Sequence, residues 1–214
     1  MKRFLLLFAA VLTAAGYIVV NLVNGGSATG VHKLLIPEEM PAFRLQELKE
    51  GLASNKYIKA YVSYVTDGDT LEINYRNKEY KVRLLCIDTP ESVKQGVEIQ
   101  SYGIEASKLT KELTLHKKVQ LVFEKGLRDR YGRLLAYIIL ENGENLNALL
   151  VRNGFARAEF VSPNTRYKEY FLKLQSKAIK DKIGMWGLDP QEQPFVREAD
   201  GDYIPRYLKF IEAS

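Results

Sequence analysis

Residues 82–91 read VRLLCIDTPE, and the rest of the chain is organised around this stretch. Its apolar residues fall on both sides of the alternation that a strand imposes, which is typical of a strand covered on both faces. Burying Arg83 in such a strand is costly unless an anion meets it. Thr89-Pro90 predicts the strand's end, because proline cannot donate to a β-ladder. Asp88 and Glu91 are therefore expected on a turn, where an acidic pair beside a cation suggests that a metal ion and a phosphate meet.

The composition is that of a folded domain with a basic surplus. A chain of 214 residues, 46% hydrophobic and 27% charged, is ordinary for a soluble domain with one good core. The net charge of +5 favours an anionic partner, such as nucleic acid, anionic lipid or a cell-wall polymer. The single cysteine, Cys86, can form no internal disulfide and is interpreted as a small buried apolar residue. With only His32 and His116 beside it, a metal site built from Cys and His is excluded.

The N-terminal segment is predicted to export or anchor the chain. A short basic head, residues 1–3, precedes a nearly continuous apolar run over residues 4–23, which is long enough for a membrane-spanning helix. Small residues at 26–28 suit a signal peptidase, so residues 1–26 are either a signal peptide or a membrane anchor, and the two alternatives stay open. Both place the rest of the chain outside the cytosol, secreted or held at the cell surface.

The remaining chain divides into a linker (residues 27–55), one folded domain (residues 56–188) and a tail (residues 189–214). Strands are expected over residues 58–66, 70–75, 82–87, 119–123 and 133–139, and helices over residues 102–113, 146–152 and 167–178. This order predicts an α+β fold, in which a five-stranded antiparallel sheet curls into a small barrel with three packed helices. The tail carries prolines and charges, and we expect a surface strap with a weak last helix.

Four features carry groups that can do chemistry, and each alone has an ordinary explanation. Asp67-Gly68-Asp69-Thr70 is either a hairpin turn or a set of carboxylates for a hard cation. Residues 88–91 are either a capped turn or a second acidic group, and Arg83 is either a structural ion pair across the strands or an anion-binding group. Residues 128–133, RDRYGR, taken alone are a solvated hairpin tip. The joint presence of all four on a small basic barrel favours a functional site.

These features occur in the order of a known family. The stretch from Tyr57 to about Leu188 resembles the staphylococcal-nuclease (thermonuclease) family through five motifs in the family's order and at compatible spacings. The motifs are residues 67–70 (DGDT), 83–91 (RLLCIDTPE), 102–106 (YGIEA), 129–137 (DRYGRLLAY) and 147–154 (NALLVRNG). The resemblance implies an OB-fold barrel and a calcium-dependent endonuclease that hydrolyses DNA and RNA phosphodiester bonds with low sequence specificity.

The resemblance also implies a metal site and a water-activating group. Asp69 and Asp88 match the family's calcium carboxylates, and Thr89 matches a ligand that binds through its backbone carbonyl. Asp67 matches an acid near the metal that is not usually a direct ligand, and Glu91 matches the residue assigned as general base. Calcium takes oxygen ligands of this kind and can act on phosphate and water as Lewis acid and template.

Phosphate and nucleotide contacts are implied for basic and aromatic residues. Arg83 and Arg133 match two phosphate-binding arginines, whose forked donors suit oxygens that gain charge in the five-coordinate transition state. Arg130 and Tyr131 resemble residues that line the family's nucleotide pocket. Near Phe160 the chain lacks the family's tyrosine pair, so stacking on a base is left to Phe160 without a phenolic hydrogen bond.

One geometric step is not contained in the spacing. On an ideal strand Arg83 and Asp88 lie on opposite faces and about 16 Å apart. They converge only if the strand bends or bulges, as the closing of a small barrel requires. The convergence is implied by the resemblance alone.

The predicted function has rivals from two other classes. The same barrel can hold single-stranded nucleic acid without cutting it, or a surface protein can use a basic face to grip wall polymer or lipid. Retention of both arginines, Glu91 and the two calcium aspartates favours the enzyme. We therefore expect an exported nuclease that acts on DNA and RNA, uses Ca²⁺ and is a monomer.

Overall fold

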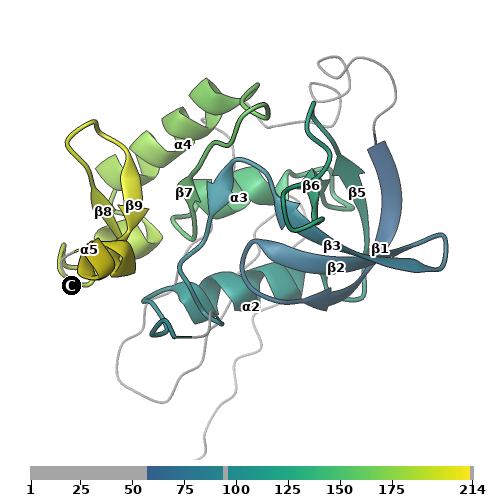
Figure 1. Cartoon of the computed structure of the whole chain (residues 1–214), viewed down its shortest axis with the longest axis horizontal. Coiled ribbons are helices and arrows are strands. Elements are labelled where there is room, and N and C mark those ends of the chain that lie inside the picture. The colour runs from purple at the N-terminus through teal and green to yellow at the C-terminus, as the bar shows by residue number, and fades with distance from the viewer. Residues whose placement is uncertain (1–56, 94–95, 213–214) are drawn as a thin grey trace, which may run out of the picture. The chain divides into compact units, whose positions relative to one another are not determined.

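The structure is a computed structural model that describes residues 57–93 and 96–212 (Figure 1). The predicted signal peptide or membrane anchor (residues 1–26), with its hydrophobic helix, lies outside these residues. The predicted linker (residues 27–55) lies outside them too. In the part of the chain that is described, no helix combines the length and the apolar character needed to cross a membrane.

Five strands close into a barrel, as the strand signals predict. They are β1 (Tyr57–Val65), β2 (Thr70–Tyr75), β3 (Lys78–Leu84), β5 (Lys118–Val122) and β6 (Leu134–Ile139). Their order around the barrel is β1-β2-β3-β6-β5, with β5 pairing back to β1. Alternate side chains point inward and exclude water from the interior. The fully buried ones include Val62, Leu71, Ile73, Val82, Leu121 and Ile138.

One strand pair corrects the expectation of an entirely antiparallel sheet. β3 and β6 run parallel, with Val82 opposite Leu134 and Leu84 opposite Ala136, whereas the other neighbouring pairs of the barrel are antiparallel. The reason is geometric, because strand directions cannot alternate all the way round a closed ring of five. At least one pair in such a barrel has to be parallel, and a parallel pair needs a long crossover.

The three predicted helices are present, as α2 (Gly103–Thr114), α3 (Leu146–Arg152) and α4 (Lys168–Lys180). The side chain of Asn145 caps α3 as expected, since its oxygen accepts a hydrogen bond from the N–H of Ala148 at 2.9 Å. α2 contacts β1, and α3 contacts both β6 and α4. The barrel and its helices therefore form the α+β, OB-fold arrangement that the sequence predicts.

The predicted central strand ends earlier than expected. β3 stops at Leu84, and a separate short strand, β4 (Ile87–Asp88), pairs with β7 (Arg157–Ala158) instead of with the barrel. Between them Cys86 has φ +62°, the left-handed conformation that non-glycine residues seldom adopt. This reversal is the bend that the convergence of Arg83 and Asp88 requires.

The tail is more ordered than the predicted surface strap. β8 (Phe195–Arg197) and β9 (Tyr203–Pro205) form an antiparallel hairpin, and α5 (Arg206–Glu212) follows. Phe195 is buried together with Trp186 of the short 3₁₀ helix η1 (Gly184–Gly187). Strands of three residues are too short to show a period of two, so the sequence pattern misses them.

Candidate active site

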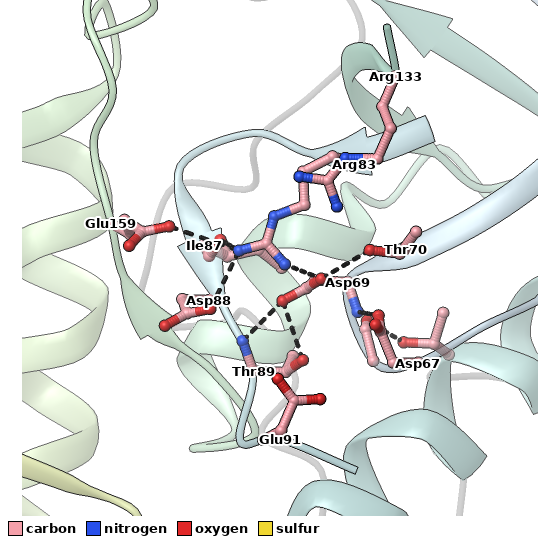
Figure 2. Close-up of polar contacts among 12 residues, drawn as sticks. Asp67, Asp69, Thr70, Arg83, Ile87, Asp88, Thr89, Glu91, Arg133 and Glu159 are labelled. Carbon is pink, nitrogen blue, oxygen red and sulfur yellow. Dashed lines mark hydrogen bonds and ion pairs between the residues drawn. The ribbon is translucent and has the colours of Figure 1, made fainter. Parts of the chain in front are cut away.

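Arg83 joins the two aspartates that the motifs contribute (Figure 2). Its guanidinium forms an ion pair with Asp69 and donates to Oδ1 of Asp88 at 3.0 Å and to the carbonyl of Ile87 at 3.2 Å. The side chain of Arg83 is 17% exposed and that of Asp69 is 2% exposed. Charges so far removed from water depend on each other, because neither recovers its hydration energy alone.

The acidic turn before β2 is held by hydrogen bonds to backbone and hydroxyl groups. Oδ2 of Asp69 accepts from the backbone N–H and the hydroxyl of Thr89 at 2.9 and 3.0 Å, and Oδ1 accepts from the hydroxyl of Thr70 at 3.0 Å. Oδ1 of Asp67 accepts the N–H of Asp69 at 3.0 Å. Burial raises the pKa of Asp67 above its usual range, and the positive charge of Arg83 opposes that shift.

Gly68 lets this turn lie against α2. A Cβ at Gly68 would approach the Thr89 side chain to 2.8 Å and Cβ of Ala106 to 2.9 Å. From α2, the hydroxyl of Thr110 donates to the carbonyl of Gly68 at 2.7 Å. Helix α2 and the loop after β4 therefore hold the turn from two sides, which fixes where Asp69 points.

Glu91 is positioned by backbone groups around it. Its Oε1 accepts the N–H groups of Ser92 and Val93, both at 3.2 Å. Its own N–H donates to Oε1 of Gln100 at 2.8 Å, and its carbonyl accepts from the N–H of Gln100 at 2.9 Å. A Cβ at Gly103 would come within 2.6 Å of the Glu91 carbonyl oxygen, so only glycine allows α2 to begin this close to the loop.

Arg133 lies on the loop over residues 128–133, just before β6, and is also paired with an acid. Its Nε donates to Oδ2 of Asp129 at 2.7 Å, and its backbone N–H donates to Oδ1 at 2.9 Å. Partial burial acts to raise the pKa of Asp129, but the hydrogen bonds and charge of Arg133 outweigh it and hold that pKa below its usual range. The guanidinium groups of Arg130 and Arg133 lie 4.9 and 5.5 Å from the centre of the exposed Tyr131 ring.

A pocket of about 610 Å³ brings these groups to one surface. Among the predicted site residues, its wall contains Asp67, Arg83, Glu91, Arg130, Tyr131 and Arg133. Asp69 and Asp88 reach the pocket through Arg83, which lines the wall and pairs with both. Residues from three separate motifs, 67–70, 83–91 and 129–137, therefore meet around one cavity.

The structure does not bring Phe160 into this wall. The chain lines the pocket with the four residues after it, 161–164. The ammonium group of Lys168 lies 5.7 Å from the centre of the Phe160 ring. The side chain predicted to stack on a base is therefore not among those that line the cavity.

Two charged residues of the site escaped the sequence analysis. Arg157, on β7, donates through Nε to Oδ2 of Asp88 at 2.9 Å and through a terminal nitrogen to Oε1 of Glu159 at 2.6 Å. Glu159 in turn reaches Arg83 at 3.4 Å and lines the pocket. Burial and the nearby charge of Asp88 raise the pKa of Glu159, while Arg157 and Arg83 oppose the rise. The alternation of charged and apolar residues in Arg157-Ala158-Glu159 is a weak strand signal in the sequence. Only the pairing of β7 with β4 shows that the two charged side chains lie beside Asp88.

The donor atoms fit a hard cation such as Ca²⁺. Asp69 and Asp88 both turn a carboxylate oxygen toward the guanidinium of Arg83, so a positive charge already stands between them. Together with the Thr89 carbonyl they offer only oxygen, which calcium prefers. Within residues 57–93 and 96–212, no three or more His, Cys, Asp and Glu side chains are gathered as a ready metal cluster. The groups that would hold such an ion are therefore the two aspartates and the Thr89 carbonyl.

The chain is similar in sequence to known proteins. Residues 81–187, half of the chain, match the family described as staphylococcal nuclease homologue. Endonuclease YncB of Bacillus subtilis (strain 168) is 36% identical over 169 residues, which cover 76% of this chain and 80% of that protein. The thermonuclease of Staphylococcus hyicus is 42% identical over 139 residues, which cover 64% of this chain and 82% of that protein. The chain therefore belongs to the staphylococcal nuclease homologue family.

Proposed function

We propose that this chain is a Ca²⁺-dependent nuclease that hydrolyses phosphodiester bonds of DNA and RNA with low sequence specificity. Relatives named endonuclease and thermonuclease support a nuclease. The observation that carries the proposal is the place of Arg83, between Asp69 and Asp88 and in the wall of the pocket that Glu91 and Arg133 also line. A phosphodiester is an anion that repels a nucleophile, and such a site can neutralise it.

The acids of the site have distinct tasks in this proposal. Asp69, Asp88 and the carbonyl of Thr89 would hold Ca²⁺, which would supply a Lewis acid and a template for phosphate and water. Arg83, which pairs with both aspartates, would bind a phosphate oxygen. The two N–H groups that hold Oε1 of Glu91 orient its carboxylate, which positions or deprotonates the attacking water.

The two arginines act on the phosphate. Arg83 enters the pocket from β3 and Arg133 from the loop just before β6, so their forked donors can reach different oxygens of one phosphate. The negative charge on these oxygens grows in the five-coordinate transition state, so the hydrogen bonds strengthen there. Losing one such donor raises the barrier by about 3–4 kcal/mol, by analogy with oxyanion-hole deletions.

The proposal includes a place of action and an organisation of the chain. Residues 1–26 export or anchor the protein, residues 27–55 link that segment to the catalytic domain over residues 56–188, and residues 189–214 follow as a tail. The basic head and apolar run support this location outside the cytosol or at the cell surface. Mass spectrometry of the mature N-terminus decides between cleavage and anchoring, and sedimentation tests the expected monomer.

Plasmid degradation tests the chemistry. The full chain is assayed with Ca²⁺, with a chelator, and as Glu91→Gln, which keeps the size of the side chain and removes its base. Cutting that needs Ca²⁺ and is lost in the variant supports the proposal. Binding to single-stranded DNA without cutting would instead make the chain a non-catalytic binding module. Absence of both would leave a surface protein with a basic face.

A further inference from the structure

The C-terminal segment over residues 189–212, here called the tail hairpin, has no part in the proposed chemistry. It begins after the family match, which ends at residue 187. It contains β8, β9 and α5, which lie together on the side of α4, away from the β1–β2 hairpin (Figure 1). Two polar contacts nevertheless connect this segment to the acids of the candidate site.

The first contact runs through Gln100. Its Oε1 accepts the N–H of Glu91 at 2.8 Å, and its Nε2 donates to the carbonyl of Pro194 at 2.9 Å. The same carbonyl accepts the N–H of Arg206, the first residue of α5, at 2.8 Å. The Glu91 N–H requires an acceptor and the Pro194 carbonyl requires a donor. These two partners therefore fix which end of the Gln100 side-chain amide is oxygen and which is nitrogen. One side chain thus joins the tail hairpin to the loop that carries Glu91.

The second contact runs through Arg157. Its Nε donates to Oδ2 of Asp88 at 2.9 Å, and a terminal nitrogen donates to the carbonyl of Tyr203 at 2.7 Å. Its guanidinium also lies 5.3 Å from the centre of the Phe195 ring. The side chain is 10% exposed, so its orientation depends on these partners more than on water. Arg157 thus joins the tail hairpin to Asp88, one of the two aspartates predicted to bind the metal ion.

The tail hairpin is firmly attached independently of these two contacts. Phe195 is 1% exposed and packs in a cluster with Trp186. The ring of Tyr203 meets that of Trp186 edge to face at 4.9 Å. Nε2 of Gln193 donates to the carbonyl of Leu188, outside the segment, at 3.2 Å. The hairpin is thereby a fixed support, and it reaches the site through backbone carbonyls whose places its fold decides.

We propose that the tail hairpin is a positioning element of the active site. It holds the loop of Glu91 through Gln100 and the carboxylate of Asp88 through Arg157. Gln100 and Arg157 are positioning residues, since each acts through another side chain or backbone group. The effect on kcat rests on the proposed nuclease function. The effect on hydrogen exchange of the Glu91 amide does not depend on that function.

Substitutions at Gln100 separate the tail contact from the loop contact. Gln100→Leu removes both hydrogen bonds of the side chain. Gln100→Glu keeps an acceptor for the N–H of Glu91 and removes the donor to Pro194. The matched control is Glu198→Gln, an acid-to-amide exchange in the tail that removes the 2.6 Å ion pair with Lys209 and leaves both contacts to the site intact.

The expected result is that Gln100→Glu behaves like Gln100→Leu. In both variants, hydrogen exchange at the Glu91 amide accelerates. Because the Glu91 carboxylate is then misplaced, kcat falls by roughly tenfold to a hundredfold, while KM changes little. A chain ending at Leu188 should show the same pattern if it retains its fold by circular dichroism, and if it unfolds the Gln100 variants decide. The Glu198→Gln control should match the unaltered chain.

Two results would overturn the positioning role. One is a Gln100→Glu variant with the Glu91 amide exchange and kcat of the unaltered chain, which would show that the tail contact is dispensable. The other is a change in KM alone. If the unaltered chain cuts no nucleic acid at all, the proposed function fails, and hydrogen exchange at Glu91 still decides whether the tail hairpin holds the loop.

Discussion

The guanidinium of Arg83 donates to Oδ1 of Asp88 at 3.0 Å, although the two residues would lie on opposite faces of an unbroken strand. The left-handed conformation of Cys86 brings them together by turning the chain between β3 and β4. A cation and an acid are thereby paired at the wall of the pocket, and the charge balance of this pair governs several properties of the protein.

Replacing Arg83 should make stability depend on calcium. Arg83→Met leaves Asp69 buried without its cationic partner, which typically costs about 3–5 kcal/mol of unfolding free energy. Ca²⁺ can then supply the missing charge without competing with a guanidinium. We expect the melting temperature to rise more steeply with Ca²⁺ in the variant than in the unaltered chain. Equal calcium responses would contradict the assignment of Asp69 and Asp88 to the metal.

Removing Glu159 should free Arg83 for an anion. Glu159 lies 3.4 Å from Arg83 and competes with phosphate for it. Glu159→Gln should therefore tighten binding of a nucleotide 5′-phosphate in chelator by up to about tenfold, the net free energy of one typical hydrogen bond. The same loss of negative charge beside Asp88 should weaken Ca²⁺ binding. Calorimetric titrations of each ligand measure the two effects.

The control for this prediction is Glu169→Gln, which removes one negative charge from the exposed side of α4. It should leave both affinities near those of the unaltered chain. A Glu159→Gln variant in which both affinities move in the same direction would show that Glu159 does not compete for Arg83.

The pairing of Asp129 with Arg133 predicts an acid-side loss of stability. The pKa of Asp129 is held below its ordinary value of 3.8 in the folded chain, so its contribution is present above pH 3.8 and disappears as pH falls through the lowered value. The pair is partly exposed, and the contribution should not exceed about 1 kcal/mol. Asp129→Asn should lack this pH dependence. Denaturant titrations at several pH values below 3.8 give the unfolding free energy of both proteins. If that free energy falls equally with pH in the variant and in the unaltered chain, the pairing is contradicted.

Adding a methyl group at Gly103 should disturb Glu91 without touching any charged group. The new Cβ would meet the Glu91 carbonyl oxygen at 2.6 Å, so the start of α2 and the loop have to move apart, at a cost of about 1–3 kcal/mol for an overpacked contact. We expect Gly103→Ala to lower kcat more than it raises KM. Ile104→Ala changes an exposed neighbour on the same helix and should preserve kcat.

The periodic elements of the chain could be predicted from the sequence because their signals are local. Alternation and helical spacing locate the barrel strands and the helices α2, α3 and α4, and Asn145 marks the start of α3. Closure of five strands then made a parallel pair unavoidable. Local spacing does not contain this relation, because it depends on how many strands complete the ring.

The sequence by itself determined which residue types are available to the site: the acids of the DGDT and DTPE motifs, Arg83 and Arg133. Only the tertiary structure decided that Arg83 meets Asp88, that Arg157 and Glu159 join them, and that the tail hairpin reaches Glu91 through Gln100. The physical reason is that these contacts follow from backbone reversals and from the pairing of distant strands. Neither leaves a periodic trace along the chain.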